Sequence, residues 1–324
     1  MTETPGNRSL SIVIVSWESG EDIVECVRSL AGARAAAACT TELIVVDNAS
    51  LEFPAAGVVA AWPEATIIRN PSNRGFGPAA NQGVAVARGD VVLLLNPDTR
   101  PVNNPLTPLL QAFADRPDAV AVAPRLLESE PAPSQGLRVH QLRRLPTLGH
   151  AARQMLLFDR AFPRNRWLAR DRYLDRDEER PFEVEQPAAA ALAVRREAFL
   201  GVGGFDEAFV PAWFEDVDLC ARLLPRGRIL YWPASRFVHE GGAAAAALGY
   251  DHFLPIYYRN AFRFWRKHHG VGAALAYRAL VCMGMVLRLL AVPLGARVPA
   301  SRSQAVVAYS RVLREAAGLG GVAH

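Results

Sequence analysis

The feature that most constrains this chain is a fully apolar run, Val91–Leu95, which ends abruptly in the polar turn Asn96-Pro97-Asp98-Thr99. Five consecutive apolar residues with turn residues on both sides predict a short strand that is buried on both faces. Such strands belong to parallel sheets covered by helices, and ligands bind at the carboxyl ends of those strands. Asp98 stands just beyond that end. On these residues alone, Asp98 is equally well interpreted as a metal or substrate ligand and as an ordinary turn former.

Strand and helix patterns alternate before this run. Strands are predicted for Leu10–Ser16, Glu42–Asp47 and Ala65–Arg69, and helices for Glu21–Leu30 and Pro78–Ala87. This alternation predicts an α/β fold in which helices flank a mostly parallel sheet. A Rossmann dinucleotide fold is the competing interpretation. However, the first turn lacks GxGxxG, and the glycine-rich loop at 70–77 follows a later strand.

Beyond Pro101 the pattern changes twice. A helix at Leu106–Ala114 and a strand at Ala119–Ala123 precede a long stretch of poor periodicity, which is rich in proline and charge up to Arg180. A long loop of this kind is typical of a lid or an acceptor site, or of a disordered segment. Regular patterns then return, and the expected elements are a strand at 188–195, a helix at 196–200 and strands at 228–232 and 237–242.

Three carboxylates lie within four residues at Glu215, Asp216 and Asp218, directly before the apolar face of a predicted helix. Acidic residues at a helix N-terminus are ordinary capping residues. Their number exceeds what capping needs, and Trp213 and Phe214 before them would supply an apolar wall.

Composition narrows the partners and the compartment. The chain has 36 basic and 32 acidic residues, and its net charge of +4 is too small to indicate nucleic acid. Its four cysteines are scattered without CxxC spacing, which favours free thiols in a reducing cytoplasm over zinc or disulfides. The polar N-terminus has no apolar core after a basic start, so a signal peptide is not expected.

Taken in order, these motifs resemble the family 2 glycosyltransferases, which have the GT-A fold and invert the anomeric centre. The resemblance covers about Leu10–Gly242 and is nearest to bacterial rhamnosyltransferase-type members. The segments that carry it are Val13-Ile14-Val15-Ser16, Val45-Val46-Asp47-Asn48, Asn73-Arg74-Gly75-Phe76-Gly77, Leu95-Asn96-Pro97-Asp98, Gly203-Gly204-Phe205-Asp206, Phe214-Glu215-Asp216-Val217 and Val238-His239.

The resemblance implies a role for each motif. Asp47 would accept a hydrogen bond from N3 of a uracil or thymine ring. Asp98 and His239 would hold a divalent metal, Mn²⁺ or Mg²⁺, with Asn96 where the family's DxD motif has its first Asp. Asp216 would be the general base. The residues expected to bind substrate are Ser16, Glu18, Asp47, Arg74, Gly75, Phe76, Asn81, Asn96, Trp213 and Glu215.

Several of these residues also have an ordinary structural interpretation. His239 can be a structural histidine at a strand end, and Asp47 can belong to an Asx turn. Arg74 can be a surface charge, and Gly75 suits any tight strand-to-helix loop.

The resemblance also implies the reaction. The expected activity is transfer of a sugar from a dTDP- or UDP-linked donor, with dTDP-rhamnose as the first choice, to a glycan, glycolipid or glycoside hydroxyl in surface polysaccharide synthesis. The alternative is a catalytically silent, nucleotide-sugar-binding membrane scaffold. A dehydrogenase is a distant third.

We expect a catalytic domain over 1–245, with a variable acceptor-side excursion at 128–185, and a helical C-terminal region over 246–324. A transmembrane helix needs about 20 uninterrupted apolar residues. The apolar segment Val271–Val298 is broken by Arg278, Arg288, Pro293 and Arg297. An amphipathic helix lying on the cytoplasmic membrane face therefore fits better than a span. A helix packed on the catalytic domain or in a homodimer is the equal alternative.

Overall fold

The computed structural model describes residues 9–37, 39–127, 141–240, 248–293 and 301–318. Expectations for the N-terminal eight residues, for 128–140 and for 294–298 lie outside this part of the chain. The chain divides into two compact units, each described by itself. The first comprises Met1–Arg144, Arg176–Pro211 and Glu215–Glu240, and the second comprises Leu145–Asp175, Ala212–Phe214 and Gly241–His324.

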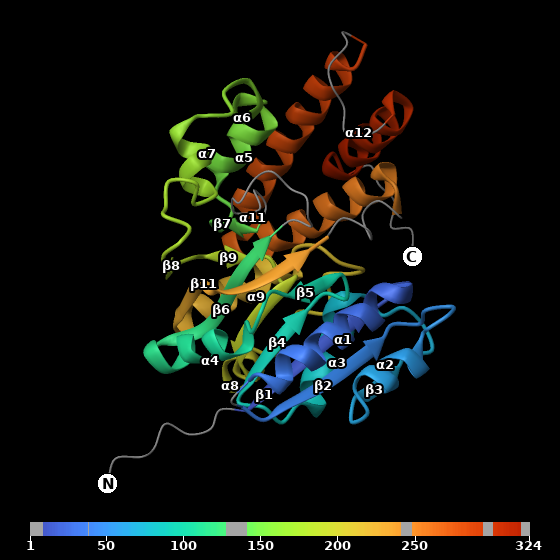
Figure 1. Ribbon diagram of the computed structural model, residues 1–324. Helices are drawn as coiled ribbons and strands as arrows, with labels where there is room; N and C mark the ends of the chain where they lie inside the picture. Colours follow the sequence, from blue (N-terminus) through green and yellow to red (C-terminus); the bar gives the residue numbers. More distant parts are fainter. Residues whose placement is uncertain (1–8, 38, 128–140, 241–247, 294–300, 319–324) are drawn as a thin grey trace. The chain divides into compact units, whose positions relative to one another are not determined.

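The first unit is built on one large sheet (Figure 1). Within the described ranges its strands lie in the order β3-β2-β1-β4-β10-β6-β11-β5, and β8 also pairs with β11. The strands are β1 (Leu10–Ser16), β2 (Thr41–Asp47), β3 (Thr66–Arg69), β4 (Val91–Leu95), β5 (Thr99–Pro101), β6 (Ala119–Leu127), β8 (Phe182–Glu183), β10 (Ala191–Arg195) and β11 (Arg228–His239). The pairings of β1 with β2 and β4, of β2 with β3 and of β6 with β11 are parallel, and helices flank the sheet, which confirms the predicted fold class.

Strand direction determines which residues share an edge. β1, β2 and β4 are parallel, so their carboxyl ends lie together, with Ser16 opposite Asp47. β10 is antiparallel to both β4 and β6, and β11 is parallel to β6. The carboxyl end of β11, at His239, therefore lies at the same edge as the end of β4.

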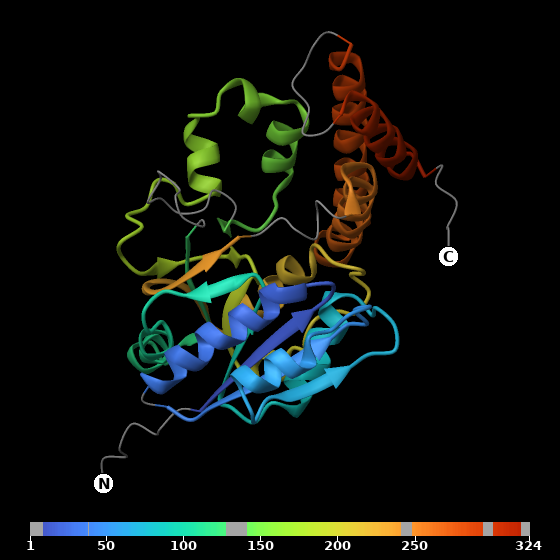
Figure 2. The same cartoon turned by 45° about the vertical axis from the view of Figure 1, so that its right-hand side comes forward.

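Helices cover both faces of this sheet, as in Figures 1 and 2. On one face, α1 (Gly20–Ala35), α2 (Ala55–Ala61) and α4 (Leu106–Asp115) pack on alternate strand residues such as Ile12, Ile14 and Val45. On the other face lies α3 (Phe76–Val86). It packs so closely that a Cβ on Gly83 would stand 2.4 Å from Val13 Cγ1.

Some helices and strands differ from those expected, and each difference has a physical reason. Helix α2 was not expected, because its seven residues, AAGVVAA, carry no clear polar face. The two strands expected at 228–232 and 237–242 are one strand, β11, whose register shifts between Trp232 and Arg236. Short helices α8 (Arg196–Gly201) and α9 (Glu215–Leu223) and a 3₁₀ turn at Leu224–Arg226 complete the sheet's surroundings.

The second unit is helical. It contains α5 (Leu148–Met155), α6 (Phe158–Ala161) and α7 (Arg166–Asp171), from the stretch of poor periodicity, together with α11 (Tyr250–Ala291) and α12 (Arg302–Ala316). α11 packs on α12 and α5, and its backbone kinks at Gly270, where φ is +79°. By length and composition, α11 is apolar enough to cross a membrane, a test that the core helix of a soluble protein also passes.

Candidate active site

The turn after β4 meets the end of β11. Strand β5 pairs antiparallel with β11, and Thr99 stands opposite His239. This pairing places His239 Nε2 at 3.2 Å from Asp98 Oδ1 and at 3.4 Å from Asn96 Nδ2. The Thr99 hydroxyl donates to the Asn96 carbonyl at 2.6 Å and closes the turn. The Asp98 and His239 side chains are 14% and 12% exposed, so the corner is sheltered but reachable.

This donor set suits a divalent cation of the Mn²⁺ or Mg²⁺ type. A carboxylate oxygen and an imidazole nitrogen are accepted ligands, and Mg²⁺ is commonly held by one or two carboxylates together with substrate phosphates. Within the described ranges, no group of three or more His, Cys, Asp or Glu side chains forms a complete metal cage. Any cation here would therefore take its remaining ligands from a bound diphosphate and water.

Asp47 ends β2 at the same edge and is fully buried. Its Oδ1 accepts a hydrogen bond from the Ser50 amide at 3.0 Å, and its Oδ2 pairs with Arg69 Nε at 3.0 Å. Each carboxylate oxygen has a further lone pair, so the group can still accept from a ligand. The nearby Glu18 amide donates to Ser50 Oγ at 2.9 Å, which ties the loop after β1 to the loop after β2.

Ser16 ends the neighbouring strand, β1. Its hydroxyl is buried and has no hydrogen-bond partner in the described part of the chain. A buried polar group without a partner is uncommon, and its place at this edge makes it a candidate substrate contact.

The glycine-rich loop before α3 is organised by Asn48, a residue that the sequence analysis did not single out as a site residue. Its Oδ1 accepts from the Arg74 amide at 3.0 Å, and its Nδ2 donates to Asn73 Oδ1 at 2.8 Å. Gly75 has φ +87°, and a Cβ there would stand 2.8 Å from the Pro211 carbonyl oxygen. Any other residue would thus be strained and would clash. The Arg74 side chain is exposed.

Phe76 and Asn81 connect α3 to the Gly203-Gly204-Phe205 turn. The Phe76 amide donates to the Pro211 carbonyl at 2.8 Å, and its ring meets Phe205 edge-on. Asn81 Nδ2 donates to the Phe205 carbonyl at 2.9 Å, and Asn81 Oδ1 accepts from the Phe205 amide at 2.9 Å. The structure therefore gives Asn81 a scaffolding role in the turn before the acidic cluster.

Glu215 and Asp216 begin α9, and their environments differ. Glu215 is buried, and its Oε2 has no hydrogen-bond partner among the described residues. Burial, followed by the neighbouring Asp216 charge, raises the pKa of Glu215 well above its usual range. Asp216 is only partly buried by surface area. Burial raises the pKa of Asp216 as well, while Arg143 and several hydrogen bonds oppose the rise. The pair thus consists of a protonation-prone Glu215 and an Asp216 that ionises more readily.

Sequence reasoning missed two residues that act on Asp216: Gln186, which donates a hydrogen bond to it, and Arg143, whose charge lowers its pKa. Strands β7 (Leu142–Arg143) and β9 (Gln186–Pro187) form a small antiparallel ribbon in which Arg143 stands opposite Gln186. The buried Gln186 donates from Nε2 to Asp216 Oδ2 at 3.2 Å, and the Val217 amide donates to Oδ1 at 2.8 Å. Strands of two residues leave no periodic signal in a sequence, so this contact could not be foreseen.

Asp218, the third acid, is bound inside the first unit. Its Oδ2 accepts from Arg222 Nε at 2.8 Å and is fully buried. Arg222 Nη1 also donates to the Val202 and Gly204 carbonyls at 2.7 Å. Asp218 therefore secures the glycine turn.

Trp213 belongs to the second unit, where its ring packs edge-on against Phe253 and its carbonyl accepts from Asn260 at 3.0 Å.

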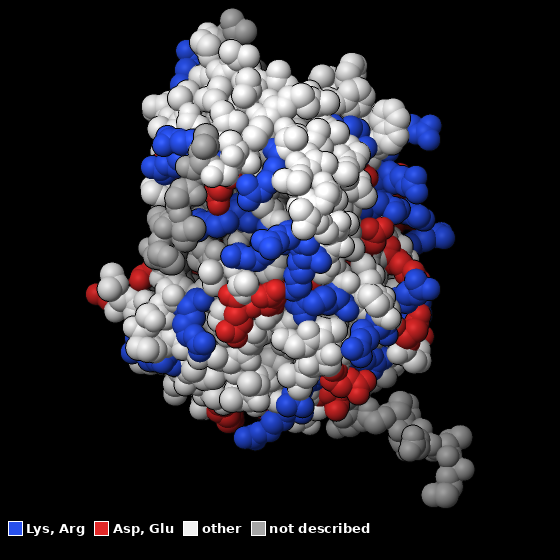
Figure 3. Space-filling view, turned by 180° about the vertical axis from the view of Figure 1, so that it is seen from behind, with Lys and Arg blue, Asp and Glu red and all other residues white. Residues whose placement is uncertain are grey.

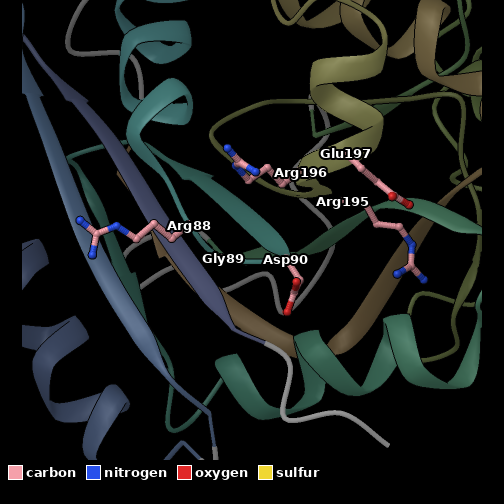
Figure 4. A pocket seen from close by; sticks show the side chains of 6 residues that line it. All are labelled: Arg88, Gly89, Asp90, Arg195, Arg196 and Glu197. Carbon is pink, nitrogen blue, oxygen red and sulfur yellow. The ribbon is translucent and has the colours of Figure 1, made fainter.

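A separate cavity of about 340 Å³ lies at the amino end of β4, which is the opposite edge of the sheet from Asp98. In Figure 4 the charged ends of its lining side chains point in different directions. Asp90 is already engaged, because its Oδ2 accepts from the Ser9 amide and hydroxyl at 3.1 and 3.0 Å. The cavity has no convergent chemistry and is not the candidate site. Its lining residues are Arg88, Gly89, Asp90, Arg195, Arg196 and Glu197.

Gln186→Leu should raise the pKa of Asp216 and so shift any activity that requires its ionised form. The Gln186 amide stabilises the ionised form of Asp216, so its loss raises the pKa of Asp216 further. A hydrogen bond to a charged group contributes about 1.5–3 kcal/mol, so its loss should have a measurable effect on that pKa. The acidic limb of the kcat/KM profile therefore moves to higher pH, with most activity recovered on the alkaline side. A uniform loss at every pH would indicate a merely structural role.

Comparison with known proteins places the chain in a family. The sequence profile described as "Glycosyl transferase family 2" matches residues 11–183, more than half of the chain. The chain therefore belongs to glycosyl transferase family 2 and is a glycosyltransferase. It is 26% identical over 276 residues to N-acetylglucosaminyl-diphospho-decaprenol L-rhamnosyltransferase of Mycobacterium tuberculosis (strain CDC 1551 / Oshkosh), covering 80% of this chain and 85% of that protein.

Solved structures share the fold. Mannosyltransferase PcManGT from Pyrobaculum calidifontis, in complex with GDP-Man and Mn²⁺, superposes with a TM-score of 0.55 at 16% identity, over 97% of this chain and 86% of that one. GalNAc-T7 with UDP, GalNAc and Mn²⁺ gives a TM-score of 0.55 at 16% identity, over 79% of this chain. The aligned region covers about half, 48%, of the GalNAc-T7 chain. The predicted GT-A fold is thereby confirmed.

Proposed function

We propose that this chain transfers L-rhamnose from dTDP-rhamnose to a hydroxyl of a lipid-linked glycan, with inversion at the anomeric carbon. The observation that carries the proposal is the chemistry gathered at one edge of the sheet: Asp47 after β2, Asp98 after β4 and His239 at the end of β11. The M. tuberculosis relative, an L-rhamnosyltransferase named for a decaprenyl-diphosphate-linked substrate, supports the choice of donor sugar and acceptor class. A UDP-sugar is the second choice of donor.

Asp216 is the general base in this proposal. As the acceptor oxygen attacks the anomeric carbon, its proton passes to an Asp216 carboxylate oxygen, and the bond from that carbon to the β-phosphate oxygen breaks. The nucleoside diphosphate leaves on the opposite face, so a single displacement inverts the configuration. Gln186 and the Val217 amide hold the carboxylate in place for this transfer.

Asp98 and His239 hold the divalent metal in this proposal, and Asn96 lies beside them. When bound, the cation neutralises the charge that grows on the β-phosphate as it leaves. The two GT-A structures above both contain Mn²⁺, which supports this assignment. Because Asn96 replaces a carboxylate, the protein ligands carry less negative charge than two aspartates would.

Asp47 binds the donor's base. Thymine and uracil both carry an N3–H that donates to a carboxylate, so Asp47 accepts either nucleotide but does not choose between them. Ser16 ends β1 and Glu18 lies in the loop that follows, and Arg74 with Gly75 lies in the loop that precedes α3. Arg74, with an exposed side chain, is the group available to the diphosphate.

A donor screen tests the proposal. A ligand at about 100 times its Kd stabilises the folded state by about 2.7 kcal/mol. For a chain of this size that corresponds to a rise in Tm of roughly 4 °C. We expect dTDP-rhamnose with Mn²⁺ to give such a shift, UDP-sugars a smaller one and GDP-mannose none, followed by transfer from the best donor to a polyprenyl-diphosphate-linked glycan. A larger shift with GDP-mannose would contradict the role of Asp47.

A further inference from the structure

The second half of α11 presents an uncharged surface. From Val271 to Leu290 the exposed positions recur every three or four residues along one side of the helix. Every one of them is apolar or glycine, and Val271, Leu275 and Leu290 are more than 60% exposed. We call this set the apolar stripe. Its members are Val271, Gly272, Leu275, Ala276, Ala279, Met283, Val286, Leu287 and Leu290.

The two arginines within this helical segment do not interrupt the stripe. Arg278 Nη1 donates to the carbonyls of Glu315 and Ala316 at 3.2 and 3.3 Å, and its guanidinium lies over the Phe262 ring. Arg288 donates to the carbonyls of Met155, Gly284 and Gln154, each at 3.0 Å. In the sequence, both arginines interrupt the apolar segment. In the structure, their guanidinium groups are bound to main-chain carbonyls inside the second unit, so the exposed side of the helix stays apolar.

The opposite side of the same helix is covered by protein. Tyr277, Val281 and Met285 are buried, and a Cβ on Gly284 would stand 2.9 Å from Met155 Cβ on α5. A helix with one side packed on α5 and α12 cannot be surrounded by lipid. The stripe covers 20 residues, which is about 30 Å at 1.5 Å per residue. Its geometry therefore suits a helix that lies along a surface.

The exposed charged side chains of α11 and α12 are all basic. Arg266 and Lys267 precede it on α11, and Arg302 and Arg314 lie on α12; all four are exposed. The acidic residues of α11 and α12 are Asp251 and Glu315. Asp251 lies 3.2 Å from Arg311 and Glu315 lies 3.5 Å from Arg259, so neither offsets this positive charge. In Figure 3 the upper part of the molecule is largely white, with Lys and Arg along its sides.

We propose that the apolar stripe, together with the basic residues of α11 and α12, docks on an anionic lipid bilayer. An apolar face with basic residues beside it binds the headgroup region in the plane of the membrane, through apolar burial and attraction to anionic lipid. Docking would bring the enzyme to the surface where a lipid-linked acceptor resides. Only this link to the acceptor rests on the proposed function. The contact itself requires no turnover.

Vesicle binding of the full chain tests the proposal without reference to activity. We expect co-sedimentation with vesicles of phosphatidylcholine containing about 30 mol % phosphatidylglycerol, little binding to phosphatidylcholine alone, and weakening with salt. The double variant Leu275→Glu/Leu290→Glu should bind roughly tenfold or more weakly. The matched control, Val59→Glu/Val86→Glu, changes two exposed apolar residues of the first unit and should bind like the wild type.

Three results would overturn the proposal: no binding to anionic vesicles, equal binding by the stripe variant, or equal loss in the control. A wild type that is dimeric by analytical ultracentrifugation, with a monomeric stripe variant and no vesicle binding, would assign the stripe to a second copy of the chain. Donor-induced thermal shifts of both variants verify folding. They also separate failure of docking from failure of the proposed function.

Discussion

Asp216→Asn lowers the rate of sugar transfer by about three orders of magnitude, within the 10²–10⁴-fold contribution of a general base. Asparagine keeps the size of the side chain but cannot take up the acceptor's proton. Donor binding, measured by thermal shift, should stay within a few-fold of wild type, because the proposed base acts on the acceptor and not on the donor.

Glu215→Gln is the matched comparison. Burial raises the pKa of Glu215 well above its usual range, so the native side chain is already protonation-prone and glutamine resembles that form. We expect a loss of about tenfold at most for this variant, well below the loss in Asp216→Asn. A reversed order of the two losses would move the base to Glu215, and full activity in Asp216→Asn would remove the base assignment.

The pH dependence of the wild type follows from the same environment. A base must be ionised to act, and burial raises the pKa of Asp216. Activity should therefore rise with pH along a limb that lies above the usual aspartate value of about 3.9. Full activity down to that value would contradict the raised pKa.

Asp98→Ala has the second largest expected effect. In the proposed site, removing the Asp98 carboxylate would leave His239 to hold the metal. Transfer should fall by about two to three orders of magnitude, in the range typical of lost transition-state charge stabilisation. The Mn²⁺-dependent part of donor binding, measured by calorimetry with and without EDTA, should disappear.

Asp90→Asn is the control for removing a carboxylate that lies next to β4 but outside the proposed metal site. Asp90 precedes the same strand but lies at its amino end, beside Ser9, so transfer and the Mn²⁺ response should be unchanged. If EDTA left wild-type transfer intact and Asp98→Ala remained active, the metal assignment would fall.

Strong local patterns predicted the corresponding strands and helices of the first unit well. The apolar run Val91–Leu95 is β4 with the expected bounds, because a strand buried on both faces leaves a continuous signal. Asp98 and His239 could be named from motifs, but their 3.2 Å approach depends on β5 pairing with β11 across 140 residues of chain. Sequence periodicity carries no information about such a pairing.

Other features required side-chain geometry. Asn81 fits a glycosyltransferase motif, yet its amide is engaged with the main chain of Phe205. Gln186 stands in a two-residue strand and gave no signal at all. Arg278 and Arg288 read as charges in the sequence, whereas their guanidinium groups bind carbonyl oxygens and leave the exposed face of α11 apolar. Composition records that a charge exists but not where its long side chain places it.

The anomeric configuration of the first-formed product tests the central claim most directly. The account requires one displacement, with Asp216 taking the acceptor's proton and the diphosphate leaving from the opposite face. Transfer from dTDP-rhamnose, followed by NMR of the anomeric proton and carbon before any epimerisation, should show the configuration opposite to that of the donor. A product with the donor's configuration would contradict the single displacement and the base role of Asp216 together.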